Sequence, residues 1–122
     1  MKIRIAPQSI RLRIKPAELT ALHAAGTLTQ SLELGPTPDQ IVSFELRVTP
    51  DPAPLQISYK TSKILIKASH ALVDELLNTE RVGATITQEV YAGTSVTVLL
   101  EKDFKCLTHR DEDVDAFPNP AA

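Results

Sequence analysis

The sequence is poor in cysteine, glycine and aromatic residues, and each shortage excludes a class of protein. It has one Cys, four Gly, no Trp, two Tyr and three Phe among 122 residues. A single thiol rules out an intrachain disulfide and a zinc site built from several cysteines. The four glycines are far apart, so the chain has neither a Rossmann fingerprint nor a P-loop, and no Gly-x-Ser-x-Gly elbow occurs. The few aromatic rings offer no stacking platform for single-stranded nucleic acid.

Neither sign of charge is in large excess. The 13 Lys and Arg against 15 Asp and Glu give a formal net charge of −2, which argues against a general nucleic-acid binder. Apolar runs are only a few residues long, so we expect no transmembrane helix and no membrane partner. Apolar and polar residues alternate in the segment Met1–Ile5, which has no apolar leader. We therefore expect a cytoplasmic protein.

Alternation of apolar and polar residues dominates the sequence and predicts β-strands, with two short helices among them. The first helix is expected at 16–25, where Pro16 fits the first turn and Gly26 the end. The second is expected at 69–77, with Ser69 as its N-cap. Strands are expected at 2–5, 10–14, 27–34, 41–49, 55–59, 63–67, 85–91 and 95–100.

The order strand-strand-helix-strand-strand occurs twice and defines two pseudo-repeats, 2–49 and 55–100. In this alignment Ile14, before the first helix, matches Ile66, before the second. The expected fold class is α+β, with a mainly antiparallel, strongly curled eight-stranded sheet or barrel and two short helices. The expectation of curling follows because a twisted sheet of this size tends to close and so remove its exposed edges.

Positive charge is concentrated at the beginning of the sequence and negative charge at its end. Residues 1–15 contain five cations and no acid, whereas residues 110–122 contain one cation and four acids. Alternation places the cations of the first two strands opposite the isoleucines that must be buried, so we expect one basic surface that faces outward. Its candidate residues are Lys2, Arg4, Arg11, Arg13 and Lys15, with Arg47 added from the fourth strand.

Three interpretations of this basic surface remain open. One is a solvated outer face of an amphipathic sheet, and another is a face neutralised by the tail acids at 111, 112, 113 and 115. The third is a site for a phosphate or carboxylate group, because the guanidinium fork binds such anions through two hydrogen bonds. We therefore expect a non-enzymatic module that binds an anionic ligand or an acidic segment of a partner, with no catalytic residue.

The C-terminal segment is the other candidate for function. We assign residues 1–103 to a single α+β domain and 104–122 to an extended tail anchored by Phe104, Cys106 and Phe117. Such a tail would pack on the same or a neighbouring chain, which makes a structural oligomer assembled through the tail an alternative function. Cys106 and His109 supply two metal ligands, fewer than a zinc site needs, so we expect no metal and no cofactor.

Both ends of the chain resemble a known family. The strings Met1–Ile5, Ser9–Arg13, Glu101–Leu107 and Asp115–Pro120 are similar to those of a small uncharacterised bacterial family whose members are about this long. The resemblance implies that the tail belongs to the family pattern. It transfers no activity, because the family has none assigned.

A duplicated barrel with cations at alternate strand positions is also similar to the tunnel-shaped triphosphatases (CYTH-like proteins). Those open with a Glu-x-Glu-x-Lys strand, in which the carboxylates hold metal and the cations hold phosphates. Here the first strand reads Lys2-Ile3-Arg4-Ile5, and no Glu-x-Glu occurs in the sequence. This resemblance implies a further alternative function, a phosphohydrolase whose metal site is degenerate.

Overall fold

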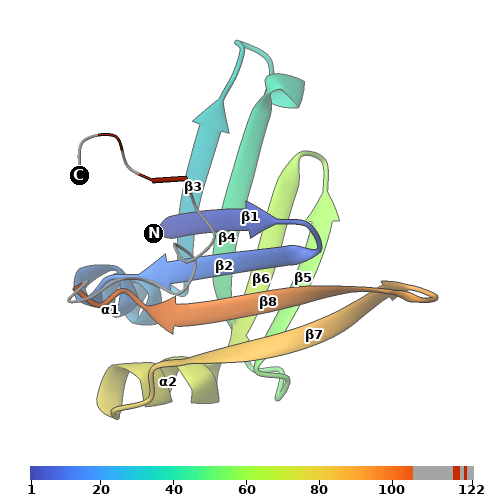
Figure 1. Ribbon diagram of the computed structural model, residues 1–122. Coiled ribbons are helices and arrows are strands. Elements are labelled where there is room, and N and C mark those ends of the chain that lie inside the picture. The colour runs from blue at the N-terminus through green and yellow to red at the C-terminus, as the bar shows by residue number, and fades with distance from the viewer. Residues whose placement is uncertain (106–116, 119, 121–122) are drawn as a thin grey trace.

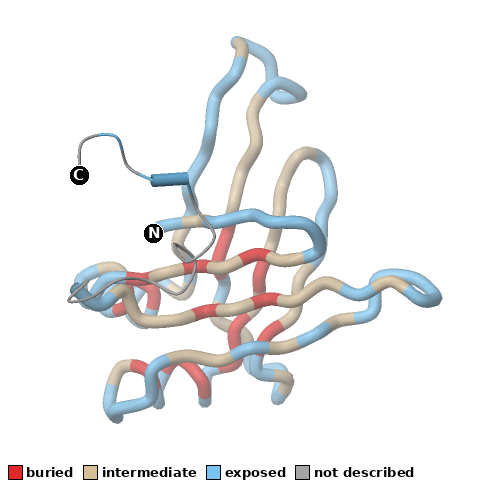
Figure 2. The backbone as a smooth tube through the Cα atoms, viewed as in Figure 1, coloured by how far each residue is buried: buried red, intermediate tan, exposed pale blue. Residues whose placement is uncertain are grey.

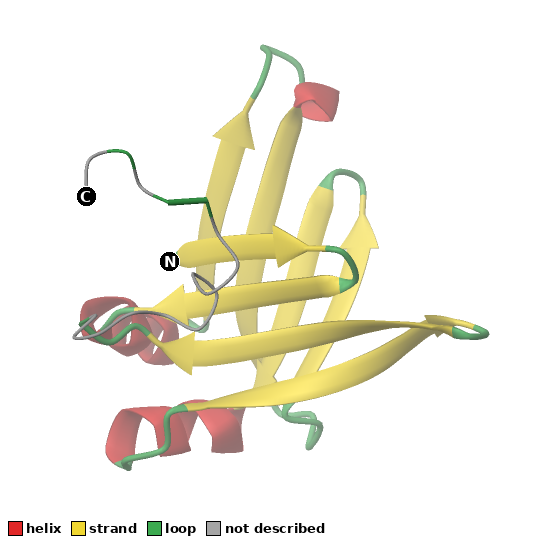
Figure 3. Ribbon diagram, in the orientation of Figure 1, coloured by secondary structure: helices red, strands yellow, loops and turns green. Residues whose placement is uncertain are grey.

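The computed structural model describes residues 1–105, 117–118 and 120, which form two four-stranded sheets and two α-helices (Figures 1 and 3). Sheet A has the strand order β1-β2-β8-β7 and sheet B the order β3-β4-β6-β5. The sheets lie one in front of the other with their strands crossing, and the helices lie at the end where β2 and β8 finish (Figure 1). The elements are β1 (Lys2–Ala6), β2 (Ser9–Ile14), α1 (Pro16–Ala25), β3 (Thr27–Glu33), the 3₁₀ helix η1 (Pro38–Gln40), β4 (Ile41–Thr49), β5 (Leu55–Lys60), β6 (Lys63–Ser69), α2 (His70–Asn78), β7 (Gly83–Tyr91) and β8 (Thr94–Lys102).

The α+β class is confirmed, but the expected single curled sheet or barrel is wrong. Each helix carries the chain from one sheet to the other, since α1 leads from β2 into β3 and α2 from β6 into β7. The eight strands of the described chain are therefore divided between two sheets that do not close. The sheets are also mixed, because the central pairs β2–β8 and β4–β6 are parallel while the outer pairs are antiparallel. Local hairpin patterns indicate the antiparallel pairs, but the parallel pairs join strands that are far apart in sequence.

The two halves of the described chain occupy equivalent places in the two sheets. Each sheet takes one hairpin from each half, and the helices follow β2 and β6, which have the same position in their sheets. In the parallel pairs Leu12 lies beside Leu100 and Ile66 beside Leu46. Ile14 lies two residues before the start of α1, and Ala68 lies two residues before the start of α2, so these two residues correspond. The sequence alignment of Ile14 with Ile66 is therefore two residues out of register. That the halves arose by duplication stays a prediction.

Both helices begin where local chemistry requires. Pro16 occupies the first turn of α1, and the left-handed Gly26 (φ +81°) ends it, its N–H donating to the carbonyl of Leu22 at 2.8 Å. The Oγ of Ser69 accepts from the N–H of Leu72 at 3.1 Å and caps α2. The expected helix positions are thus confirmed to within one residue.

The core lies between the two sheets and the helices (Figure 2). It joins alternate residues of β2 and β8 to alternate residues of β4 and β6 and to the inner faces of α1 and α2. Because Ile10, Leu12 and Ile14 point into this core, Arg11 and Arg13 project from the opposite, outer face of sheet A. The largest fully buried side chains are Leu12, Ile14, Leu22, Leu46, Ile66, Leu72, Leu76, Leu100, Val73 and Val98.

Candidate basic site on sheet A

Four of the six predicted basic residues meet on the outer face of sheet A. The antiparallel register of β1 and β2 places Lys2 opposite Arg13 and Arg4 opposite Arg11. These four residues and Ile3 line a hollow of about 130 Å³. We call Lys2, Arg4, Arg11 and Arg13 the basic face. The sequence prediction that they share one outward surface is consistent with this arrangement.

Like charges stand directly opposite one another in both of these pairs. Such an arrangement destabilises an antiparallel ladder unless an anion lies between or beside the cations. Glu101 of β8 supplies one negative charge, with its Oε1 2.9 Å from Nε of Arg11 and 2.8 Å from Nε of Arg13. The parallel pairing of β2 with β8 brings Glu101 beside Arg13, so this contact joins positions far apart in the sequence. A sequence reading of β1 and β2 alone could not find it.

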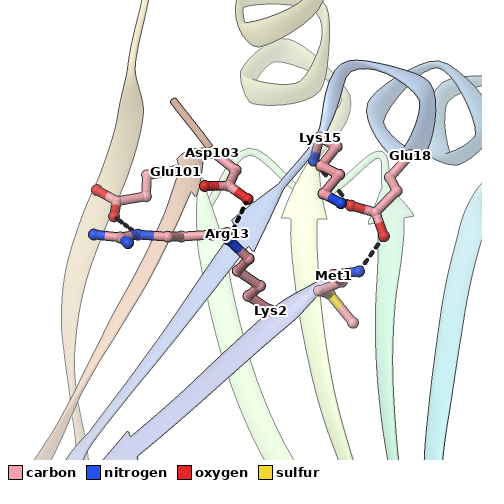
Figure 4. A network of polar contacts seen from close by, with 7 residues as sticks. All are labelled: Met1, Lys2, Arg13, Lys15, Glu18, Glu101 and Asp103. Atoms are coloured by element: carbon pink, nitrogen blue, oxygen red, sulfur yellow. Dashed lines mark hydrogen bonds and ion pairs between the residues drawn. The ribbon is translucent and has the colours of Figure 1, made fainter. Parts of the chain in front are cut away.

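Asp103, two residues after Glu101, supplies a second negative charge to the basic face through Lys2 (Figure 4). Its Oδ2 lies 3.1 Å from Nζ of Lys2. The hydrogen bond from Lys2 lowers the pKa of Asp103, and the positive charges of Lys2, Arg13 and Lys15 lower it further, against a smaller opposing effect of burial. The carboxylate is therefore ionised at neutral pH.

Lys15 lies at the start of α1, next to this cluster. Its main-chain N–H donates to Oε1 of Glu18 at 2.9 Å, and the N-terminal ammonium of Met1 pairs with the other oxygen of Glu18 (Figure 4). Burial raises the pKa of Glu18, but the hydrogen bonds from the ammonium and from Lys15, with their positive charges, outweigh burial and leave the pKa below its ordinary value. This contact fixes the beginning of β1 to the helix.

Arg47 does not join the basic face, because β4 belongs to sheet B. Its Nε donates to Oε2 of Glu45 at 2.7 Å, and Nζ of Lys63 lies 2.5 Å from Oε1 of the same carboxylate. Glu45 is only 7% exposed, and the hydrogen bond from Lys63, followed by that from Arg47, lowers its pKa despite burial. The sequence patterns did not indicate this second cluster as a site. The signal that could have indicated it is the Glu45-x-Arg47 spacing, which puts both side chains on one face of the strand.

The predicted tail anchors are placed only in part. Phe104 is 61% exposed and lies beside a cavity of about 270 Å³ between α1, α2 and the end of β8. Phe117 is fully exposed. Cys106, His109 and the tail acids lie outside the described residues. Within the described part of the chain, no three His, Cys, Asp or Glu side chains come together to hold a metal ion.

The geometry defines the molecule as an α+β protein of two mixed four-stranded sheets, with a basic outer face on one of them. The chain belongs to the family of unknown function DUF7009, whose model matches residues 1–121. Searches of curated proteins and of solved structures gave no significant match. None of the helices in the described residues is long and apolar enough to cross a membrane.

Proposed function

We propose that this protein is a non-enzymatic module that binds an anionic group on the basic face of sheet A. The observation that carries the proposal is the β1–β2 register, which sets Arg4 against Arg11 and Lys2 against Arg13. Like charges held directly opposite one another repel, and Glu101 and Asp103 supply two negative charges to these four cations. A bound anion would add further attraction.

The shape and chemistry of the basic face support a small, multiply charged ligand group. The hollow is small, and its cations come from two adjacent strands of a packed sheet, so their main-chain positions need no rearrangement on binding. Glu101 orients Arg11 and Arg13 through their Nε atoms. A phosphate-bearing molecule and an acidic peptide segment share the chemistry that this face would recognise.

The alternatives are less well supported by the fold. A tunnel-type triphosphatase needs its cations inside a closed sheet, whereas the two sheets here are open and the basic face points outward. Neutralisation by the acids at 111–115, and oligomerisation through the tail, involve segments outside the described residues and stay predictions.

Isothermal titration of the full chain with pyrophosphate, and separately with an oligoglutamate peptide, tests the proposal and distinguishes the two ligand sources. The test variant is Arg4→Gln/Arg11→Gln. The control is Arg81→Gln, because Arg81 follows α2, pairs with Glu75 of that helix and does not belong to the basic face. We expect the test variant to bind at least about tenfold more weakly, since charge-assisted hydrogen bonds contribute roughly 1.5–3 kcal/mol each.

The control should bind like the wild type, and wild-type affinity should fall as salt is added. Absence of binding to both ligands would overturn the proposal. Equal affinities of the test variant and the wild type would also overturn it.

A further inference from the structure

The outer edge of β3 presents backbone hydrogen-bonding groups along its whole length. Among the strands that the structure describes, β3 pairs only with β4. The N–H of Val48 donates to the carbonyl of Gly26, and the N–H of Leu34 to the carbonyl of Gln40, each at 2.9 Å. These two bonds fix the phase of the ladder, so the even-numbered residues of β3 bond to β4. The odd-numbered residues, Thr27, Thr29, Ser31 and Glu33, direct their N–H and C=O groups away from the sheet.

The other three edge strands each carry a feature that obstructs further pairing. β1 has only five residues and presents Lys2 and Arg4. The pairing of β7 has a register irregularity between Glu89 and Tyr91. On β5, the side chain of Gln88 already occupies the main-chain N–H and C=O of Ile57. Charges, bulges and covering groups of these kinds are the means by which proteins protect sheet edges.

β3 has one charged residue, Glu33, and otherwise lacks these protections in its seven residues. Its sequence Thr-Leu-Thr-Gln-Ser-Leu-Glu contains no proline and no cation, and its register with β4 is continuous. Leu32 is 55% exposed, and Leu34, just after the strand, is 70% exposed. A regular edge with exposed leucines and a single charged residue, Glu33, is suited to pairing with another strand of low charge.

We propose that β3 pairs with β3 of a second copy of this chain, antiparallel and centred on Gln30, to form one eight-stranded sheet across a two-fold dimer. In this register Thr29 faces Ser31 of the second copy, and Thr27 faces Glu33 of the second copy. These four residues direct their backbone N–H and C=O groups outward, so each of these two kinds of facing pair exchanges two hydrogen bonds. The pairing is self-complementary, as a two-fold interface requires.

The side chains of β3 favour a second copy as the occupant. On the face that continues the core, Leu28 lies opposite the exposed Leu32 of the second copy, which buries apolar surface on both chains. Glu33 is the one charged residue of β3, and it lies opposite an uncharged threonine, so no like charges meet. The edge has no charge pattern that would select a strongly acidic or basic partner.

Sedimentation equilibrium of the full chain tests the proposal, with two variants that differ at one position. Thr29→Lys/Ser31→Lys sets lysine against lysine in the proposed register and should weaken the dimer by about tenfold or more. Thr29→Lys/Ser31→Glu sets each new lysine against a new glutamate and should restore dimerisation close to that of the wild type. Circular dichroism and melting confirm that both variants are folded.

A wild type that is monomeric at high micromolar concentration would overturn the proposal. That outcome includes the case in which another segment of the chain, or another protein, pairs with the edge of β3. The proposal would equally fail if the two-lysine variant stayed dimeric or the charge-paired variant stayed monomeric.

A second measurement does not depend on introduced charges. Gln30→Cys in a Cys106→Ser background places one thiol on the proposed two-fold axis, where facing side chains approach closely enough for a disulfide. Under mild oxidation this variant should form covalent dimers much faster than Ser58→Cys, a control on the exposed part of edge strand β5. Equal rates would contradict the proposed pairing.

Discussion

Gln88 of β7 holds the main chain of Ile57 in β5 through both ends of its side-chain amide. Its Nε2 donates to the carbonyl of Ile57 at 2.8 Å, and its Oε1 accepts from the N–H of Ile57 at 3.0 Å. One side chain thus satisfies two polar groups on the edge of sheet B and ties it to the edge of sheet A. The two sheets are joined at this corner by an amide that imitates a neighbouring strand.

Replacing Gln88 by alanine should therefore destabilise the protein by about 1–3 kcal/mol, because two backbone groups lose their partner in a partly buried site. Gln88→Glu is an informative comparison, since a carboxylate can accept from the N–H of Ile57 but cannot donate to its carbonyl. It should be about as damaging as alanine or more so. Urea unfolding of the wild type and the two variants gives the values. Midpoints of both variants equal to that of the wild type would contradict this role of Gln88.

Removal of the negative charge of Glu101 should have two opposite effects. Glu101→Gln weakens the contacts to Arg11 and Arg13, so the free energy of unfolding should fall by about 1–2 kcal/mol. The same change makes the basic face more positive, so pyrophosphate should bind more tightly. Thermal melting and calorimetric titration measure the two effects. A variant that loses stability without gaining affinity would place the ligand elsewhere.

Stability should fall in mild acid. The carboxylates of Glu18, Glu45 and Asp103 all have pKa values lowered by folding. Their unfolded forms therefore take up protons more readily, and the stabilisation present at neutral pH is lost as the pH drops below the ordinary value of 4.5 for glutamate. Melting temperatures should change little from pH 7 to 5 and decline below that.

The variant Glu45→Gln supplies the control for this pH dependence. It removes one titrating group, so its melting temperature should depend less steeply on pH than that of the wild type. A wild-type melting temperature that stays constant down to pH 3 would contradict the expectation.

The turn between β5 and β6 is strained and open to improvement. Thr61 and Ser62 have φ angles of 51° and 62°, a left-handed conformation that costs an ordinary residue roughly 1–2 kcal/mol. Asn-Gly is the pair that such a two-residue turn prefers, so Thr61→Asn/Ser62→Gly should raise the free energy of unfolding by about 1–2 kcal/mol. Thr61→Ala keeps the unfavourable angle and should give no gain. Denaturant midpoints measure the change, and a loss of stability in the double variant would contradict the presence of strain in this turn.

Local patterns were enough to locate the elements of this protein but not to arrange them. Pro16, Gly26 and Ser69 marked the helix ends correctly because caps depend on neighbours in sequence. The strand periods also placed the cations of β1 and β2 on one surface. The sheet assignments of β2 and β4 depend on parallel partners in β8 and β6, and no local signal encodes such pairing.

The same limit applies to the candidate site. Alternation predicted the basic residues, but it grouped Arg47 with them because a single curled sheet was assumed. Glu101 could be assigned to the site only from the β2–β8 register, which places it beside Arg13. Partners that neutralise a charge across a sheet are chosen by tertiary structure, so sequence reasoning identified the cations and missed their counter-ions.

The parallel pairing of β2 with β8 has a consequence for how the protein is made. The chain must be synthesised as far as Thr97 before Ser9 can pair with it and sheet A can assemble around its central pair, β2–β8. At about 5–20 residues per second on the ribosome, β2 spends roughly 4–18 s without β8. During that time the β1–β2 hairpin exposes both a backbone edge and its apolar face. Nascent chains halted before β8 should therefore be the form most readily captured by chaperones, whereas sheet B can already assemble once β6 has emerged.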